Sequence, residues 1–308
     1  MKKSKYNIHP DFEPWSNFKP KLNKVSLFFM QQLMNLSVYS EKSDDLCDVE
    51  KLEIPNSGKK IKALLYSPKV VSKNCPCLVY FHGGGFVLPA APYHYQNARK
   101  YAVMCGCKVL FVDYPLAPKN KFPTQINACY KAYCWILRNS KKFSINKNKI
   151  AVGGDSAGGN FASVISMKAQ DNKITKPCGQ MLIYPAAGFN PDTPSMQKYT
   201  DTPMCNSEDC KRYAKFYFSN IKDMTDKYAC PMNAQDYSIF PPTYIETAEF
   251  DCLKDEAIEY AKKLNRAGVK TTLNNTLQTM HGYDIVQDCQ ITKDNLEKRI
   301  EFLKKIFS

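Results

Sequence analysis

Short apolar runs alternate with helix-length segments over most of this chain. From residue 77 onward the runs are Cys77 to Phe81, Val109 to Val112, Ile150 to Val152, Met181 to Tyr184, Thr243 to Ala248 and Val269 to Leu273. Short apolar runs separated by helices are typical of buried strands in a parallel sheet. We therefore predict an α/β fold in which helices flank a mostly parallel central sheet.

Two segments before this region alternate apolar and polar residues. Asp48 to Ile54 and Ile61 to Tyr66 show this period of two, and the turn-forming tripeptide Asn56-Ser57-Gly58 separates them. This pattern predicts an antiparallel hairpin. At the other end of the chain, apolar residues recur near helical spacing between residues 295 and 307, so we expect a C-terminal helix that packs on the sheet.

Two segments interrupt the alternation of strands and helices. Residues 1 to about 45 carry a scattered amphipathic pattern, with Leu27, Met30 and Met34 as examples, which favours one or two helices. A stretch between Phe189 and Pro241 contains no strand-like run and is too long for a bare loop inside a compact domain. We predict a single domain over residues 1–308, with a helical cap formed by about 1–45 and about 190–238.

Composition and charge exclude several classes of protein. The chain is 44% hydrophobic and contains no run of the roughly 18 to 20 apolar residues that a membrane-spanning helix requires. The net charge of +14 is distributed along the whole chain without a dense basic block, and only five of the basic residues are Arg. We therefore expect neither nucleic-acid binding nor stable membrane insertion, although weak attraction of anions stays open.

The thirteen cysteines do not show the spacing of a disulfide framework. Cys75-x-Cys77 and Cys105-x-Cys107 adjoin strand-like runs, and no further Cys or His pair is placed to complete a tetrahedral zinc site. We expect buried, reduced thiols and no metal. The lysines near the N-terminus are followed by charged residues and prolines rather than by the apolar core of a signal peptide, so we predict a cytoplasmic protein.

The first chemical motif is Gly154-Asp155-Ser156-Ala157-Gly158-Gly159, directly after the run Ile150 to Val152 and before a helix-forming stretch, Asn160 to Gln170. The pattern G-x-S-x-G at a strand-to-helix turn is typical of a nucleophilic serine, because the sharp turn tolerates no side chain two positions away. We predict that Ser156 is the nucleophile. A structural or phosphate-binding glycine turn is the alternative, but no Gly-Lys-Ser/Thr of a P-loop follows.

The second motif, His82-Gly83-Gly84-Gly85-Phe86, follows the run Cys77 to Phe81. Consecutive glycines allow backbone N–H groups to approach a substrate closely, which suits an oxyanion hole. We assign Gly83 and Gly84 as donors, with the N–H of Ala157 as the third. A flexible glycine loop is the alternative.

A serine needs a base, and the chain has four histidines. His9 belongs to the polar N-terminal arm, and His82 is expected to brace the glycine loop by hydrogen bonding. His94 lies at the start of a predicted helix and precedes the turn at Ser156 in the chain. His281 follows the last predicted strand, where its loop should reach the carboxyl edge of the sheet, so we predict that it is the base.

The carboxylate that orients the base should follow the preceding strand. Asp251 is the first acid beyond that strand, which gives the chain order Ser, Asp, His expected of a serine hydrolase with a parallel sheet. Asp255 and Glu256 are expected to begin the next helix, where acidic groups are favoured. Asp284 remains an alternative orienting group, although it lies very close in sequence to His281.

These motifs resemble those of the hormone-sensitive lipase family of α/β-hydrolases, which contains bacterial acetyl esterases and arylacetamide deacetylases. The resemblance spans roughly residues 45–308 and includes further segments: Val112-Asp113-Tyr114, Leu116-Ala117-Pro118, Phe122-Pro123, Leu182-Ile183-Tyr184-Pro185 and Pro241-Pro242. It implies the α/β-hydrolase fold, a triad of Ser156, Asp251 and His281, and no cofactor. It also implies the same three oxyanion donors.

Several positions depart from the family's pattern. Pro115 and Lys119 stand where the family usually has Arg and Glu, Cys252 replaces the usual Pro after the catalytic Asp, and Ala257 replaces a common Gly. All four adjoin the expected site. We expect them to influence loop rigidity and substrate fit.

The resemblance implies a serine carboxylesterase that hydrolyses small-molecule esters with acetyl to butyryl chains through an acyl-enzyme. Phe86 and Tyr114 are expected to form part of the acyl or alcohol pocket, with plain packing as the alternative. Two other functions stay open. One is amide or peptide hydrolysis by the same triad, and the other is non-catalytic ligand binding, as in plant hormone receptors of this family. Those receptors lack the triad histidine, which this chain retains at His281.

Overall fold

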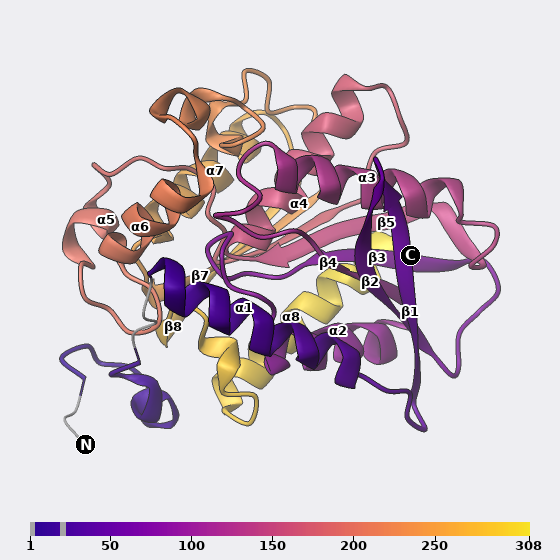
Figure 1. Cartoon of the computed structure of the whole chain (residues 1–308), viewed down its shortest axis with the longest axis horizontal. Helices are drawn as coiled ribbons and strands as arrows, with labels where there is room; N and C mark the ends of the chain where they lie inside the picture. The colour runs from indigo at the N-terminus through magenta and orange to yellow at the C-terminus, as the bar shows by residue number, and fades with distance from the viewer. Residues whose placement is uncertain (1–3, 19–22) are drawn as a thin grey trace.

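A computed structural model describes residues 4–18 and 23–308, without the side chains of Lys24 and residues 33–39. Its eight-stranded sheet has the order β1-β2-β4-β3-β5-β6-β7-β8 (Figure 1). The strands are β1 (Cys47–Asn56), β2 (Lys59–Pro68), β3 (Cys75–Phe81), β4 (Lys108–Asp113), β5 (Ile145–Asp155), β6 (Gln180–Ile183), β7 (Thr243–Phe250) and β8 (Thr271–Met280). Strands β3 to β8 pair in parallel, which confirms the predicted sheet.

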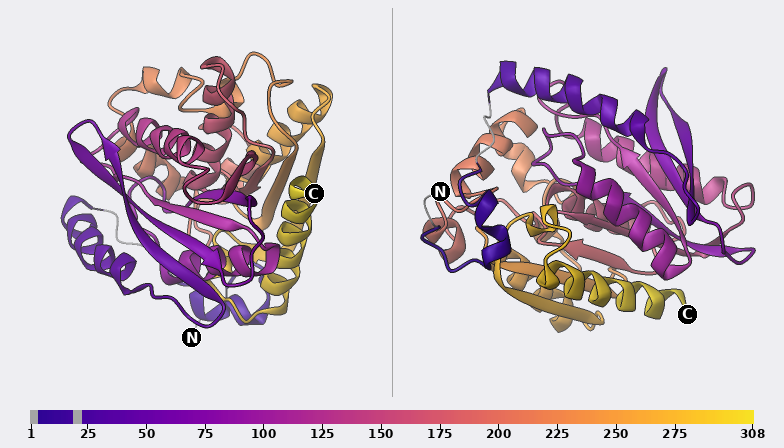
Figure 2. Two further views of the ribbon diagram at one scale, coloured as in Figure 1. Left: turned by 90° about the vertical axis from the view of Figure 1, so that its right-hand side faces the viewer. Right: turned by 90° about the horizontal axis from the view of Figure 1, so that it is seen from below.

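Strands β1 and β2 form the predicted antiparallel hairpin, with Ile54 opposite Ile61 and Asn56 opposite Lys59. The turn consists of Ser57 at φ 45° and Gly58 at φ 78°. Two successive residues with positive φ match the right-handed twist of the flanking strands, and glycine adopts this conformation at little cost. The hairpin and the C-terminal strand β8 lie at opposite edges of the sheet (Figure 2).

Helices cover both faces of the sheet, with α3, α4 and α7 on one face and α2 and α8 on the other (Figure 1). Their bounds are α2 (Pro92–Cys105), α3 (Thr124–Arg138), α4 (Ala157–Asp171), α7 (Lys254–Arg266) and α8 (Gln290–Phe307). Strand β3 shows how the sheet feeds two cores. Val79 and Phe81 belong to the core under α3 and α4, whereas Leu78 and Tyr80 belong to the core under α2 and α8.

Two strand boundaries differ from the pattern of apolar residues. Strand β5 begins at Ile145, five residues before the apolar run, and β8 begins at Thr271 but continues to Met280. β8 is the edge strand and many of its side chains are exposed, so its polar composition conceals it in the sequence. Its extension matters for the site because it brings the chain up to His281.

The segments predicted as a cap contain helices of different lengths. Between β6 and β7 lie α5 (Pro194–Lys198), α6 (Ser207–Tyr217), η2 (Ile221–Thr225) and η3 (Pro231–Asn233), and the N-terminal region contains η1 (Pro10–Trp15) and α1 (Lys24–Ser40). The two regions touch, because the N–H of Met204 donates to the carbonyl of Phe18 over 3.2 Å. Leu27 is buried as the amphipathic pattern predicts, whereas the Met34 side chain lies outside the described residues.

Within residues 4–18 and 23–308, none of the helices combines the length and the apolar character needed to span a bilayer.

Candidate active site

Ser156 lies in a sharp turn between β5 and α4, with φ 52° and ψ −116°. A non-glycine residue with positive φ is strained, so the surrounding chain must enforce this conformation. Gly154 and Gly158 make the turn possible, because a Cβ atom at either position would collide with the carbonyl oxygen of Phe81. The structure thus explains both glycines of the motif by the close approach of β3.

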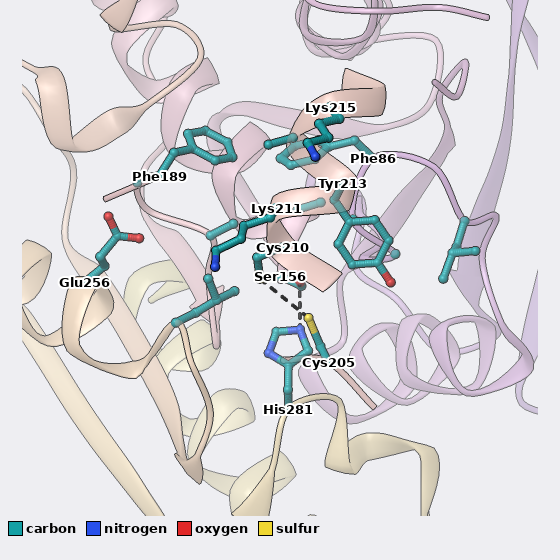
Figure 3. A pocket seen from close by; sticks show the side chains of 18 of the residues that line it. Phe86, Ser156, Phe189, Cys205, Cys210, Lys211, Tyr213, Lys215, Glu256 and His281 are labelled. Atoms are coloured by element: carbon teal, nitrogen blue, oxygen red, sulfur yellow. Dashed lines mark hydrogen bonds between the residues drawn. The ribbon is translucent and has the colours of Figure 1, made fainter. Parts of the chain in front are cut away.

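Three side chains from distant parts of the sequence form one hydrogen-bond chain. The Oγ of Ser156 lies 2.9 Å from Nε2 of His281 (Figure 3). Nδ1 of His281 lies 2.7 Å from Oδ2 of Asp251. Each residue follows the carboxyl end of a parallel strand, β5, β7 or β8, so the sheet brings them to one edge. Ser156 and His281 are 7% exposed and Asp251 is fully buried. The arrangement can move a proton from the serine to the imidazole.

The structure selects one of the candidate acids for His281. The other carboxylate oxygen of Asp251, Oδ1, accepts the N–H of Leu253 over 2.9 Å, which fixes its orientation. Asp284 instead accepts the hydroxyl of Tyr184 over 2.7 Å and pairs with the buried Arg299. Asp284 is therefore committed to a separate buried network behind the site.

The charge state of His281 depends on two opposing effects. Burial lowers its pKa, because it disfavours the charged imidazolium. The carboxylate of Asp251 favours the imidazolium by its charge and hydrogen bond, and the net result is a pKa above the ordinary value.

The raised pKa of His281 predicts how kcat/KM falls on the acid side of the pH profile. A base must be neutral to accept the serine proton, and a raised pKa keeps His281 protonated to a higher pH. We expect kcat/KM for ester hydrolysis to fall, as the pH is lowered, at a pH above the ordinary imidazole value of about 6.5. A pH series with an activated ester measures this limb. Full activity well below pH 6 would contradict the assignment of an imidazole base.

The glycine loop lies beside Ser156. Gly84 has φ 108° and Gly85 has φ 57°, and a Cβ at Gly84 would collide with the Leu88 carbonyl. Gly84, Gly85 and Ala157 line the cavity at Ser156, whereas Gly83 does not. Ala157 is the first residue of α4, and the first N–H groups of a helix have no intrahelical acceptor. Gly84 of the loop and Ala157 of α4 therefore both line the cavity, whereas Gly83 does not.

His82 and Tyr114 brace this loop from beneath. Nδ1 of His82 donates to the carbonyl of Gly83 over 2.7 Å, which is the bracing role expected for this histidine. The ring of Tyr114 stacks on His82 at 4.3 Å, and its hydroxyl donates to the His82 carbonyl over 2.7 Å. Burial and the neighbouring His94 lower the pKa of His82 to about 3, so it stays neutral. Tyr114 is not among the residues that line the cavity, so its side chain supports the loop by packing.

A cavity of about 790 Å³ opens above Ser156 and His281. Its lining is mainly apolar and includes Phe18 from the N-terminal region, Phe86 from the glycine loop, and Phe189, Met196, Tyr213, Phe218 and Met224 from the segment between β6 and β7. Lys211 and Lys215 add ammonium groups to the wall, and Glu256 adds a carboxyl group whose pKa is raised to about 7 by burial (Figure 3). The size and apolar lining suit a small organic ligand.

Comparison with known proteins places the chain in a family. Residues 78–285 match the family described as alpha/beta hydrolase fold, a span that contains both glycine motifs, Ser156, Asp251 and His281. The chain belongs to the alpha/beta hydrolase fold family. This confirms the fold class and the family resemblance predicted from the sequence.

Relatives of this hydrolase include named esterases. The carboxylesterase NlhH of Mycobacterium tuberculosis is 34% identical over 227 residues, 72% of this chain and 71% of NlhH. An arylesterase of Saccharolobus solfataricus is 31% identical over 242 residues, 78% of each protein. Among solved structures, an esterase of Pyrobaculum calidifontis has a TM-score of 0.87 and 31% identity, covering 97% of this chain and 99% of that protein. A bacterial heroin esterase has a TM-score of 0.88 and 28% identity, and 98% of each chain is covered.

Sequence reasoning missed a second buried network behind the serine of the hydrolase. Asp155 accepts the hydroxyl of Tyr80 over 2.8 Å, and Nε2 of His94 donates to it over 3.1 Å. Nδ1 of His94 accepts the N–H of Ala91, which fixes this tautomer. Burial alone would raise the Asp155 pKa, but His94 and Tyr80 lower it below the ordinary value. The signal for this network was the acid beside Ser156 in the motif, but its partners are distant in sequence.

Two groups of side chains in the described ranges gather atoms that commonly bind metals. Cys205, Cys210 and Cys252 form one, and His9, Asp11 and Cys289 form the other. All thirteen cysteines are free. The first group borders the cavity, because Cys205 and Cys210 line it. Proton transfer along Ser156, His281 and Asp251 involves neither group.

Proposed function

We propose that this chain is a serine carboxylesterase that hydrolyses short-chain acyl esters through an acyl-enzyme. The observation that carries the proposal is the hydrogen-bond chain from Ser156 Oγ through His281 to Asp251, which opens into a cavity lined mainly by apolar side chains. The carboxylesterase and arylesterase relatives confirm the enzyme class, a carboxylic ester hydrolase. We propose in addition the catalytic roles of Ser156, His281 and Asp251 and the preference for short acyl chains.

In the proposed mechanism, Nε2 of His281 removes the proton from Ser156 as Oγ attacks the ester carbonyl. The Asp251 carboxylate accepts a hydrogen bond from the Nδ1–H group of His281, which holds the imidazole in this tautomer and stabilises the imidazolium. The N–H groups of Ala157 and Gly84, which line the cavity, stabilise the developing oxyanion. His281 then protonates the departing alcohol, and a water molecule activated by the same imidazole hydrolyses the acyl-enzyme.

The preference for short acyl chains is supported by the packing around the glycine loop. The ring of Tyr213 lies directly on Gly85, where any Cβ would collide with the ring. The Phe86 ring stacks on Tyr217 at 4.0 Å and is held against Phe161, so it has little freedom to withdraw. We propose that these rings limit the acyl side and that the larger remaining cavity receives the alcohol part.

We propose further that residues 1–45 and 190–238 act as the cap of this cavity. Phe18 and helix α6 contribute to its walls, so movement of either segment would change access to Ser156. The partners that follow from this site are small-molecule esters. A cytoplasmic location stays a prediction.

A series of p-nitrophenyl esters of increasing acyl length tests the proposed preference. We expect kcat/KM to be highest for acetyl to butyryl esters and to fall by at least about tenfold by octanoyl. Each methylene buried in an open pocket would contribute roughly 0.8 kcal/mol to binding, so a fall shows that longer chains clash with the aromatic rings. Reducing the wall with Phe86→Ala should extend the accepted length. Rising activity up to long acyl chains would contradict the preference, and faster cleavage of the matching p-nitroanilides would favour an amide hydrolase.

A further inference from the structure

Three thiols from separate segments meet at the edge of the cavity. Sγ of Cys210, on α6, lies 3.7 Å from Sγ of Cys205 and 3.5 Å from Sγ of Cys252, and all three sulfurs lie within 4.8 Å of one another. Cys205 precedes α6, whereas Cys252 directly follows Asp251 in the loop after β7. The trio therefore joins the segment between β6 and β7 to the loop that carries the orienting acid.

These separations match those of thiolates around one metal ion. With a Zn–S distance of about 2.3 Å, sulfurs at tetrahedral angles lie about 3.8 Å apart, and sulfurs at trigonal angles about 4.0 Å apart. The Cys205–Cys210 and Cys210–Cys252 sulfur separations fall slightly below these values, so small side-chain movements would open the trio around an ion. Thiolate ligands select soft cations over Mg²⁺ or Ca²⁺.

Burial alone does not account for this arrangement. Cysteine often packs as a small apolar residue, and six of the ten cysteines outside the trio lie on strands or helices. These three differ because Cys205 and Cys210 line the cavity, through which an ion can enter (Figure 3). Cys252 is also the residue that replaces the usual proline after the orienting acid.

We propose that Cys205, Cys210 and Cys252 form a three-thiolate site for a soft d¹⁰ cation such as Zn²⁺, and that its occupation inhibits the enzyme. A bound ion would tie α6 to the loop of Asp251 and restrict the cap above Ser156. Binding requires deprotonated thiols, so it releases protons and strengthens as the pH rises. The metal site stands by itself, whereas the inhibition rests on the proposed function.

The binding test uses the full chain, kept reduced by a phosphine, and Cd²⁺ as the probe. Thiolate-to-cadmium charge-transfer absorbance is followed in competition with a chelator. We expect one tight ion per chain, and Cys205→Ser and Cys210→Ser should each weaken binding by more than the about 10- to 100-fold typical of outer-shell partners. Cys134→Ser and Cys178→Ser are matched controls, because these half-buried thiols lie outside the trio. Equal affinity in the trio variants and the wild type would overturn the site.

The inhibition test measures p-nitrophenyl acetate hydrolysis in the same samples. We expect stoichiometric Cd²⁺ to suppress the reaction, EDTA to restore it, and the remaining activity of Cys210→Ser to be insensitive to Cd²⁺. Tight binding without loss of activity would overturn the inhibitory role. A chain that binds Cd²⁺ tightly but hydrolyses no ester without metal would support the site and overturn the proposed function, so the two failures are distinguishable.

Discussion

Ser156→Ala is expected to lower kcat for p-nitrophenyl acetate by about 10⁵- to 10⁶-fold, the scale seen when the nucleophile of another serine hydrolase is removed. Alanine lacks the hydroxyl that must attack the carbonyl, while the proposed oxyanion donors remain. The residual rate should therefore still exceed that of the reaction in water. Pre-steady-state kinetics of the wild type with excess substrate should show a burst of p-nitrophenol if deacylation limits turnover, and the variant should show none.

Ser163→Ala is the matched control for this prediction. Ser163 lies on the same helix α4, is 1% exposed and contacts the hydroxyl of Tyr260, away from His281. Its replacement should reduce thermal stability with little change in kcat. A Ser156→Ala protein that is folded and retains wild-type turnover would refute the proposed nucleophile.

Asp251→Asn is expected to lower kcat by about 10⁴-fold, as found for a triad aspartate elsewhere. The asparagine amide can donate to Nδ1, so His281 is stabilised in the tautomer that cannot accept the serine proton. The loss of the carboxylate also removes the charge that raises the His281 pKa, while burial still lowers it. The acid limb of the remaining activity should therefore move to lower pH, which a full pH profile of kcat/KM measures.

Asp255→Asn provides the comparison for Asp251. Asp255 accepts the N–H of Ser195 over 2.7 Å, so it fastens α5 to the start of α7 rather than contacting His281. We expect a lower melting temperature and a small change in kcat. If instead Asp255→Asn caused the larger loss of turnover, the orienting acid would have to be reassigned.

The local motifs could be interpreted from the sequence because their requirements are steric and short-range. The turn at Ser156 needs glycine two residues before and after it, and the structure traces both requirements to the Phe81 carbonyl. The alternation of apolar runs with helices likewise predicts a parallel sheet, since buried strands in such a sheet need apolar residues on both faces. Strand β8 was harder to delimit, because its exposed edge carries polar residues.

Other features depend on distances between residues far apart in the chain. From the sequence, Tyr114 could either line the substrate pocket or pack without contacting the substrate. Its stacking on His82 in the structure shows that its side chain supports the glycine loop. Asp155 is bound by Tyr80 and His94, which come from two different elements. No spacing rule in the sequence relates such positions, since each contact depends on how strands and helices pack.

The sequence by itself determined the fold class and the strained serine turn, because each follows from local sterics and from the period of apolar residues. The tertiary structure decided that Asp251 rather than Asp284 contacts His281, since the Asp284 carboxylate is bound by Tyr184 and Arg299 instead. It also brought the sulfurs of Cys205, Cys210 and Cys252 together across three segments. Such convergence depends on long-range packing, which no local pattern records.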